Sequence, residues 1–160
     1  MSTLVIRLLG RPQIERDGVA VAPPRGHKPW SVLAHLALAG RPVPRPQLAT
    51  LIFADAADPL GALRWTLAQL RRALGVPEAL RGDPLELGLP PGAVVDVLAL
   101  RDGDPERALA RGELLEGVEP DAGTVFASWL LVERRRAAGQ CEAVVREAAL
   151  GALAAGAPLE

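Results

Sequence analysis

The chain has 160 residues, of which 49% are hydrophobic and 23% are charged, and its formal net charge is -1. This length allows one compact domain and part of a second, since domains typically contain about 100 to 150 residues. No stretch approaches the roughly 20 consecutive apolar residues of a membrane span, and the first ten residues lack the apolar core of a signal peptide. We therefore expect a cytoplasmic protein that does not associate with a membrane.

The charge is divided unevenly along the chain, and its sign changes near Asp96. Residues 1–96 contain 11 Lys or Arg and 8 Asp or Glu, a net charge of +3, whereas residues 97–160 contain 7 and 11, a net charge of -4. A basic part followed by an acidic part points weakly to nucleic acid as the partner of the first and protein as the partner of the second.

Three short strands are predicted at the start of the chain, at residues 3–9, 12–16 and 19–22. The first is an apolar run with β-branched members, the other two are shorter runs, and Asp17-Gly18 between them is a strong signal for a two-residue hairpin turn. The Pro23-Pro24-Arg25-Gly26 segment then ends the strand pattern.

Two helices are expected next. Residues 28–39 form the first, with Pro29 suited to the first turn and Gly40 suited to the C-terminal cap. After a proline-containing connection at 41–45, the apolar spacing between Gln47 and Phe53 predicts a second helix of about two turns. Residues 55–59 mark its end.

The third helix, at residues 59–74, has the clearest pattern. Steps of three and four residues place five leucines on one stripe: Leu60, Leu63, Leu67, Leu70 and Leu74. Gly75 closes the helix, and residues 79–81 and 85–87 flank Gly82-Asp83-Pro84 as a hairpin.

From residue 96 the pattern is helical, and no further strand is predicted. Helices are expected at 96–101, at 105–111 and from about 123 to 155. The long helix keeps helical spacing through Phe126, Leu130, Ala137, Cys141, Val144 and Ala148, so one face should pack on neighbouring helices. The sequence offers no clear partner for this face, and we expect the 160 residues to be part of a longer protein.

The side of the third helix opposite the leucine stripe carries the strongest functional signal. It contains Trp65, Ala68, Gln69 and Arg72, with Arg64 and Arg71 at its edges. Helices that enter the major groove of DNA present Arg and Gln to base edges and phosphates, and small side chains allow a close approach.

The alternative for this helix is an ordinary amphipathic helix, with solvated arginines and Trp65 packed on the hairpin that follows. The order of elements favours the DNA interpretation. The order is that of a winged helix-turn-helix: a helix, a short connection, a second helix, a longer basic helix and then a hairpin.

Several segments also carry a family resemblance: LVIRLLGRPQIERDGVAV, HKPWSVLAHLALAGRPVPRPQLATLIF, ALRWTLAQLRRALG, GDPERALARGELLEG and FASWLLVERRR. In these segments and their order the chain resembles the SARP family of antibiotic regulatory proteins. In that family an OmpR-type winged helix is followed by a bacterial transcriptional activator domain, BTAD.

The resemblance implies an α+β winged helix at residues 1–95, with a three-stranded sheet, a recognition helix at 59–74 and a wing at 79–87. An all-α, tetratricopeptide-like and incomplete BTAD would follow at 96–160. The implied function is sequence-specific binding of double-stranded DNA at promoter repeats and activation of transcription. RNA polymerase would be contacted by residues 53–59, and a homodimer on DNA is one arrangement that the resemblance allows.

The resemblance also implies a set of DNA-binding residues. Arg71 would lie at the phosphate-facing edge of the recognition helix and Arg81 on the wing, and the exposed side would contain Arg64, Trp65, Ala68, Gln69 and Arg72. Many relatives carry a polar residue at the position of Trp65. Many also carry Arg or Lys at the position of Gln69. The wing lacks the usual aromatic residue, and its Asp83 and Glu86 would repel phosphates if they faced the duplex.

Other titratable residues are given structural interpretations. His27 and His35 are isolated, which is more typical of structural or solvated histidines than of catalytic ones. Asp55, Asp58 and Asp83 could suggest a cation site, but their spacing matches no calcium loop, and Asp58 is well placed as a helix N-cap.

The long helix contains two further features. The run Glu133-Arg134-Arg135-Arg136 is interpreted as a solvated face with local pairing, with a phosphate or protein contact as the alternative. Trp129, at the spacing of Phe126, is interpreted as a core anchor, and Cys141 as a small buried apolar residue.

The chain contains neither the set of residues nor the context of an enzyme. A Ser-His-Asp set, a GxSxG elbow, a phosphate-binding loop and paired acid-base carboxylates are all missing from the sequence. The single cysteine argues against a disulfide and a usual zinc site. We therefore expect no catalytic residue, cofactor or metal. Two alternatives to the DNA-binding regulator stay open: a protein-interaction adaptor with a winged fold, and a fragment of a larger relative with an ATPase domain.

Overall fold

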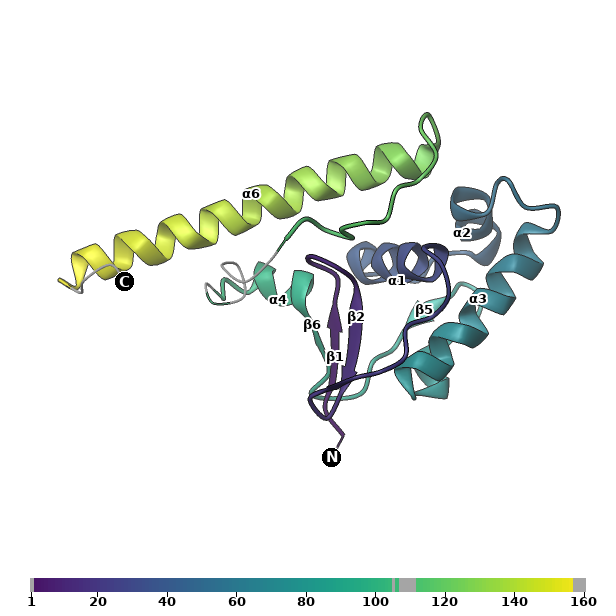
Figure 1. Ribbon diagram of the computed structural model, residues 1–160, viewed down its shortest axis with the longest axis horizontal. Helices are drawn as coiled ribbons and strands as arrows, with labels where there is room; N and C mark the ends of the chain where they lie inside the picture. Colours follow the sequence, from purple (N-terminus) through teal and green to yellow (C-terminus); the bar gives the residue numbers. More distant parts are fainter. Residues whose placement is uncertain (1, 105, 107–111, 157–160) are drawn as a thin grey trace.

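The computed structural model describes residues 2–104, 106 and 112–156, and the chain has an α+β fold with a small sheet and several helices (Figure 1). The first half contains β1 (Leu4–Arg7), β2 (Gln13–Arg16), β3 (Val19–Ala20), α1 (Lys28–Ala39), α2 (Arg45–Ile52) and α3 (Pro59–Leu74). A 3₁₀ turn, η1 (Pro77–Ala79), then leads to β4 (Leu80–Arg81), β5 (Glu86–Leu87), β6 (Val94–Val95), α4 (Asp96–Arg101) and α6 (Val125–Ala154). The helix predicted at 105–111 falls, apart from Glu106, outside the described residues.

The N-terminal sheet has four strands in the order β3-β2-β1-β6, so the prediction of three strands was incomplete. The first three form the expected antiparallel meander, and Asp17 and Gly18 both have positive φ angles, as a tight hairpin turn requires. The fourth strand, β6, runs parallel to β1, with Val5 opposite Val94. Two residues are too few to show an alternating pattern, and their partner lies about 90 positions away, so sequence periodicity could not reveal this strand.

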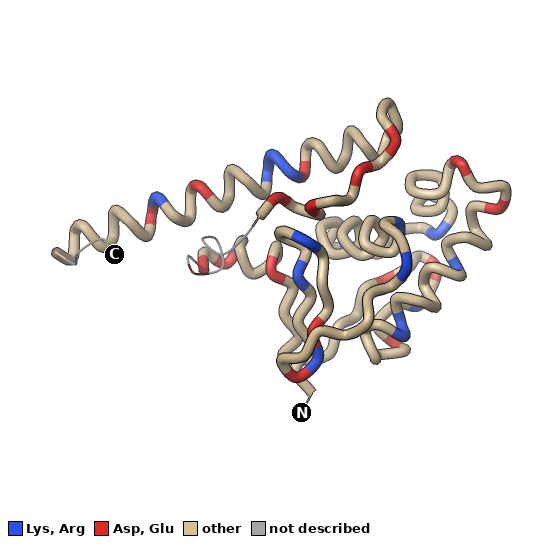
Figure 2. Tube along the Cα trace, in the orientation of Figure 1, with Lys and Arg blue, Asp and Glu red and all other residues tan. Residues whose placement is uncertain are grey.

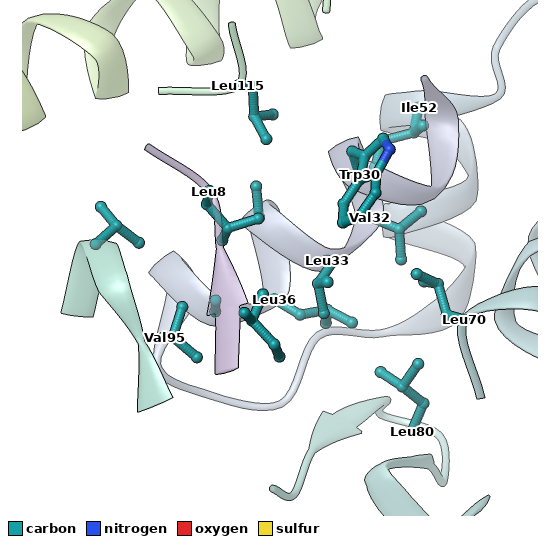
Figure 3. Close-up of a cluster of buried hydrophobic side chains, with 14 of the residues drawn as sticks. Leu8, Trp30, Val32, Leu33, Leu36, Ile52, Leu70, Leu80, Val95 and Leu115 are labelled. Carbon is teal, nitrogen blue, oxygen red and sulfur yellow. The ribbon is translucent and has the colours of Figure 1, made fainter. Parts of the chain in front are cut away.

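Helix α1 is the centre of the fold and lies between the sheet on one side and α2 and α3 on the other (Figure 1). Side chains are buried around most of its circumference, as expected for a central helix. In Figure 3, Leu33 and Leu36 of α1 belong to one cluster with Leu8 and Val95 from the sheet side and Leu70 from α3. This cluster fixes the position of α3 relative to the sheet.

Helix α3 has the predicted bounds, and four leucines of its stripe, Leu63, Leu67, Leu70 and Leu74, are fully buried. Leu60 does not belong to this buried stripe, because 42% of its surface is exposed. It lies in the first turn, directly after the exposed residues 57 and 58, where the core ends. The first turn of α3 is therefore only partly packed, through residues such as Ala62, and depends on its cap as well.

Gly75 ends α3 in the left-handed conformation, and its N–H donates to Arg71 O. A Cβ at this position would overlap the guanidinium of Arg16, which lies against the C-terminal end of the helix. We expect Gly75→Ala to lower the free energy of unfolding by about 1 kcal/mol through the left-handed φ, because the exposed Arg16 side chain can move aside at little cost. Urea denaturation measures the loss.

Gly40 supplies the matched control, because it ends α1 in the same conformation with open space around its Cβ position. Gly40→Ala should cost only the backbone penalty, about 1 kcal/mol. We expect equal losses in the two variants, and a loss for Gly75→Ala that is larger by about 1 kcal/mol would mean that Arg16 is held rigidly against the end of α3.

The chain after β6 returns to the sheet and forms a backbone contact that the sequence did not predict. Leu9 and Leu114 form an antiparallel bridge, and Leu115 N donates to Leu8 O at 2.8 Å. This bridge is isolated, and the described residues after β6 form no further strand, as expected. Val95, Val97, Leu100 and Leu114 belong to the same buried cluster as the sheet residues. The division into domains at residues 1–95 and 96–160 stays a prediction. The residues on both sides of this boundary pack into the same buried cluster.

Helix α6 is 30 residues long and extends beyond the rest of the fold (Figure 1). Phe126, Leu130 and Ala137 are buried as predicted, whereas Ala148 is exposed and does not continue the packed stripe. Ala148 is exposed because this part of α6 extends beyond the elements on which the first half of the helix packs. In the described part of the chain, neither α6 nor any other helix is long and apolar enough to cross a membrane.

Candidate nucleic-acid interface

The start of α3 is fixed by a side-chain cap. Asp58 accepts a hydrogen bond from Gly61 N through Oδ1 at 3.0 Å, which confirms the N-cap prediction. A Cβ on Gly61 would overlap the Asp58 carboxylate, so glycine leaves room for this cap. Pro59 occupies the first turn, where its missing N–H costs nothing. The orientation of the helix start is therefore set locally.

Four of the predicted DNA-binding residues lie together on the exposed side of α3. Arg64, Trp65, Ala68 and Arg72 are exposed and follow one another along the helix. Trp65 is 61% exposed, so it is not packed away on the hairpin as the alternative interpretation requires. It instead lines a shallow pocket together with the chain segment before α1. A large exposed ring beside arginines is unusual for a surface that only meets water.

Gln69 is not on this exposed surface, which corrects the prediction. Only 9% of the residue is exposed, and its Oε1 accepts a hydrogen bond from Arg25 N at 3.2 Å. The helical wheel placed Gln69 opposite the leucines, but the segment that leads into α1 covers this part of α3. Gln69 therefore holds that segment in place, and its amide oxygen is not free for a base edge.

Arg71 is half-buried and donates from Nε to Leu80 O at 2.8 Å and from Nη2 to the same oxygen. It was predicted at a phosphate-facing edge, and the structure instead places its guanidinium on the first strand of the hairpin. The end of α3 lies beside β4, so a long side chain at this position reaches the strand carbonyl. Arg71 thus fixes the hairpin relative to α3.

The predicted hairpin is present, and its tip is held against the start of α2. Strands β4 and β5 pair antiparallel, and Val43 forms a further bridge with Leu85. At the tip, Asp83 accepts from Arg45 N at 3.0 Å, and Arg45 Nε donates to Gly82 O. Arg81 is exposed on β4, as predicted for a wing residue.

The three aspartates considered as a cation site have separate partners. Asp55 pairs with Lys28 at 2.7 Å, and this contact lowers the pKa of the Asp55 carboxyl. Asp58 caps α3 and Asp83 binds Arg45 N. The described residues contain no group of three potential metal ligands.

The charge run on α6 is partly structural, which corrects its interpretation as a solvated face. Arg134 donates from Nε to Leu114 O and from Nη2 to the carbonyls of Leu115 and Val118, each at 2.9 Å. Glu133 is buried and pairs with Arg136 at 2.9 Å. The segment before α6 folds back along the helix, so its carbonyls lie within reach of Arg134. Sequence reasoning missed this role because the run itself is an ordinary surface pattern.

Two aromatic side chains join the long helix to α1. Trp129 stacks on His35 with ring centroids 4.9 Å apart and on Phe126 at 5.4 Å, consistent with its predicted role as an anchor. Burial, with a smaller contribution from Arg41, lowers the pKa of His35 to about 4. His35 is therefore a neutral packing residue at physiological pH. Cys141 is half-buried, and burial raises the pKa of its thiol.

The charged residues of the two faces of the molecule differ. In Figure 2, Lys and Arg lie along α3 and the neighbouring chain, with Asp and Glu in the loops at the two ends of α3, whereas Asp and Glu predominate in the segment that leads into α6. The exposed side of α3 is thus a basic surface on a chain whose net charge is -1. Such a surface fits a polyanion better than a neutral or basic partner.

Comparisons with known proteins support the fold. No family model matches the chain, and no curated protein sequence matches it. Among solved structures, the chain is similar to that of Mycobacterium tuberculosis EmbR in complex with a low affinity phosphopeptide, with a TM-score of 0.59 and 22% sequence identity. The similarity covers 98% of this chain and 52% of the EmbR chain, so the chain spans about half the length of EmbR.

Proposed function

We propose that the chain is the DNA-binding part of a bacterial transcription regulator, in which α3 enters the major groove. The observation that carries the proposal is the exposed row Arg64, Trp65, Ala68 and Arg72 on a helix capped at both ends and held by Arg71 and Gln69. A rigid basic helix with a small residue in its middle can approach a duplex closely.

The residues of this surface take different parts in the proposed contact. Arg64 and Arg72 bind phosphates or guanine edges, and Ala68 leaves room for the groove wall. Arg81 on β4 reaches the neighbouring backbone as a wing residue. Gln69 and Arg71, which were first expected to touch DNA, act as positioning residues for the helix.

The likeness to EmbR, a regulator of the SARP family, supports a regulatory role for the same fold. We extend it by proposal to a cytoplasmic activator that binds promoter repeats, as a homodimer on DNA, and contacts RNA polymerase through residues 53–59. In this proposal α4 and α6 begin a tetratricopeptide-like BTAD.

The experiment compares binding of the chain to DNA fragments from its own regulatory regions at two salt concentrations. Arg64→Ala and Arg72→Ala should each weaken binding by about 10- to 100-fold, because each contact is worth about 1 to 3 kcal/mol. Arg135→Ala is the matched control, an exposed arginine on α6 far from α3, and should bind as the unmodified chain does. Unchanged binding in both α3 variants would reject the assignment of α3 as the reading helix.

A second candidate, a protein-interaction adaptor, is favoured by one observation. Five apolar side chains of α6 are more than half exposed: Val125, Leu131, Val132, Leu150 and Leu153. Such exposure is typical of a surface that packs on another protein. Salt separates the two functions, because DNA affinity falls steeply with salt through counterion release while an apolar protein contact changes little.

A further inference from the structure

A shallow pocket of about 500 Å³ lies beside the exposed side of α3. One wall is formed by Trp65, Gln69 and Arg72 of the helix, and the other by residues 21–25 and by Arg16 at the end of β2. The pocket therefore adjoins the proposed reading surface and shares Trp65 and Arg72 with it. Neither Arg16 nor Arg25 was expected from the sequence to meet DNA.

The charged side chains that line this pocket are all positive. Three arginines, Arg16, Arg25 and Arg72, line it, and no Asp or Glu does. Like charges in a concave surface reinforce one another and raise the local concentration of anions. Guanidinium groups also bind phosphate oxygens in pairs, which favours a phosphate over a simple halide.

The apolar part of the pocket narrows the choice of anion. The exposed ring of Trp65 forms part of the lining together with Pro23 and Pro24. An isolated phosphate would make no use of this flat apolar wall, whereas a sugar–phosphate chain presents both a charged group and an apolar ring face. The exposed ring of Trp65 is thus available for contact with an apolar part of a ligand.

The pocket wall is held in place from within. Arg25 N donates to Gln69 Oε1 at 3.2 Å, so the segment before α1 is fixed to α3 between two residues that line the pocket. The Arg16 guanidinium lies against Gly75 at the end of the same helix. The backbone from which Arg25 extends is therefore held against α3, and arginines from three separate stretches of chain line the same pocket.

We propose that this pocket binds the sugar–phosphate backbone of one DNA strand at the edge of the groove that α3 enters. Arg16 and Arg25 take phosphate oxygens, and Trp65 packs on a deoxyribose. The contact is independent of base sequence. It increases the affinity for DNA and fixes the position of α3 along the duplex. This inference rests on the proposed DNA-binding function.

The test measures how the affinity of the 160-residue chain depends on salt, with two 30-base-pair duplexes, one from a bound regulatory fragment and one of random sequence. In the double variant Arg16→Gln/Arg25→Gln, the slope of log affinity against log salt should decrease by about 2, since each phosphate contributes about 0.9. Both duplexes should lose affinity by the same factor, so that base preference is unchanged. Arg16→Lys/Arg25→Lys should keep the slope, and the control Arg135→Gln should not change it.

Trp65 is tested separately, because it carries no charge. Trp65→Ala should weaken binding of both duplexes by about 10-fold through the loss of apolar contact with the deoxyribose, with the salt slope unchanged. Trp65→Phe should retain most of the affinity.

The outcomes separate this inference from the proposed function. If the Gln double variant keeps the salt slope while Arg64→Ala abolishes selective binding, the pocket proposal is wrong and the reading helix stands. If the Lys double variant lowers the salt slope as much as the Gln variant, the effect does not come from the charge of these side chains, the arginines are structural and the pocket proposal is also wrong. If the unmodified chain binds neither duplex in a salt-dependent way, the proposed function and the inference are both rejected.

Discussion

Asp96→Ala is expected to remove a large part of the stability of the fold. The carboxylate is 1% exposed and accepts hydrogen bonds from Leu8 N at 2.8 Å, Leu9 N at 3.1 Å and Val97 N at 2.7 Å. Alanine would leave these buried N–H donors without that acceptor. Since a hydrogen bond to a charged group is worth about 1.5 to 3 kcal/mol, we expect a loss of about 4 kcal/mol.

Urea denaturation followed by far-UV circular dichroism measures this loss. Asp102→Ala is the matched control, an exposed aspartate that follows α4, and should change the free energy of unfolding by less than about 0.5 kcal/mol. Asp96→Asn should fall between the two, because its amide keeps one acceptor oxygen. A loss for Asp96→Ala no larger than that of Asp102→Ala would show that the junction between β1 and α4 does not depend on this carboxylate.

The parts of the fold that could be predicted from the sequence are those set by neighbouring residues. Asp17-Gly18 determines its hairpin turn, and Asp58 and Gly75 determine the two ends of α3. In each case the deciding contact spans at most four positions, so spacing and residue type contain the information. The β1–β6 pairing depends on residues about 90 positions apart and has no such signature.

The same distinction applies to the candidate interface. Arg64, Trp65, Ala68 and Arg72 were placed correctly on the exposed side of α3, because the leucine stripe defines the opposite side. Gln69 was misplaced because its partner, Arg25 N, lies 44 positions away and covers it. The pocket beside Trp65 was missed for the same reason, since Arg16, Arg25 and Arg72 come together only in the folded chain. A helical wheel defines the faces of an isolated helix and contains no information on which of them another segment covers.

A second large effect is expected from pH, through His35. The ring is stacked on Trp129, and neither ring nitrogen has a hydrogen-bond partner among the described residues. Burial lowers the pKa of His35 from 6.5 to about 4, so the folded state holds the neutral form while the unfolded state takes up a proton. The stability from this group is complete above about pH 7 and is lost as the pH falls through 6.5 towards 4. By pH 4 the loss should amount to about 3 kcal/mol, since each pKa unit corresponds to about 1.4 kcal/mol.

His35→Phe isolates this effect, because phenylalanine keeps an aromatic ring against Trp129 and cannot titrate. The difference in free energy of unfolding between the variant and the unmodified chain is measured by urea denaturation at pH 7.5, 6, 5 and 4. Carboxylates titrate in both proteins and cancel in this difference, so it should grow in favour of the variant by about 3 kcal/mol towards pH 4. A difference that stays constant over this range would mean that His35 can be protonated within the fold, and that the contact between α1 and α6 opens to admit water.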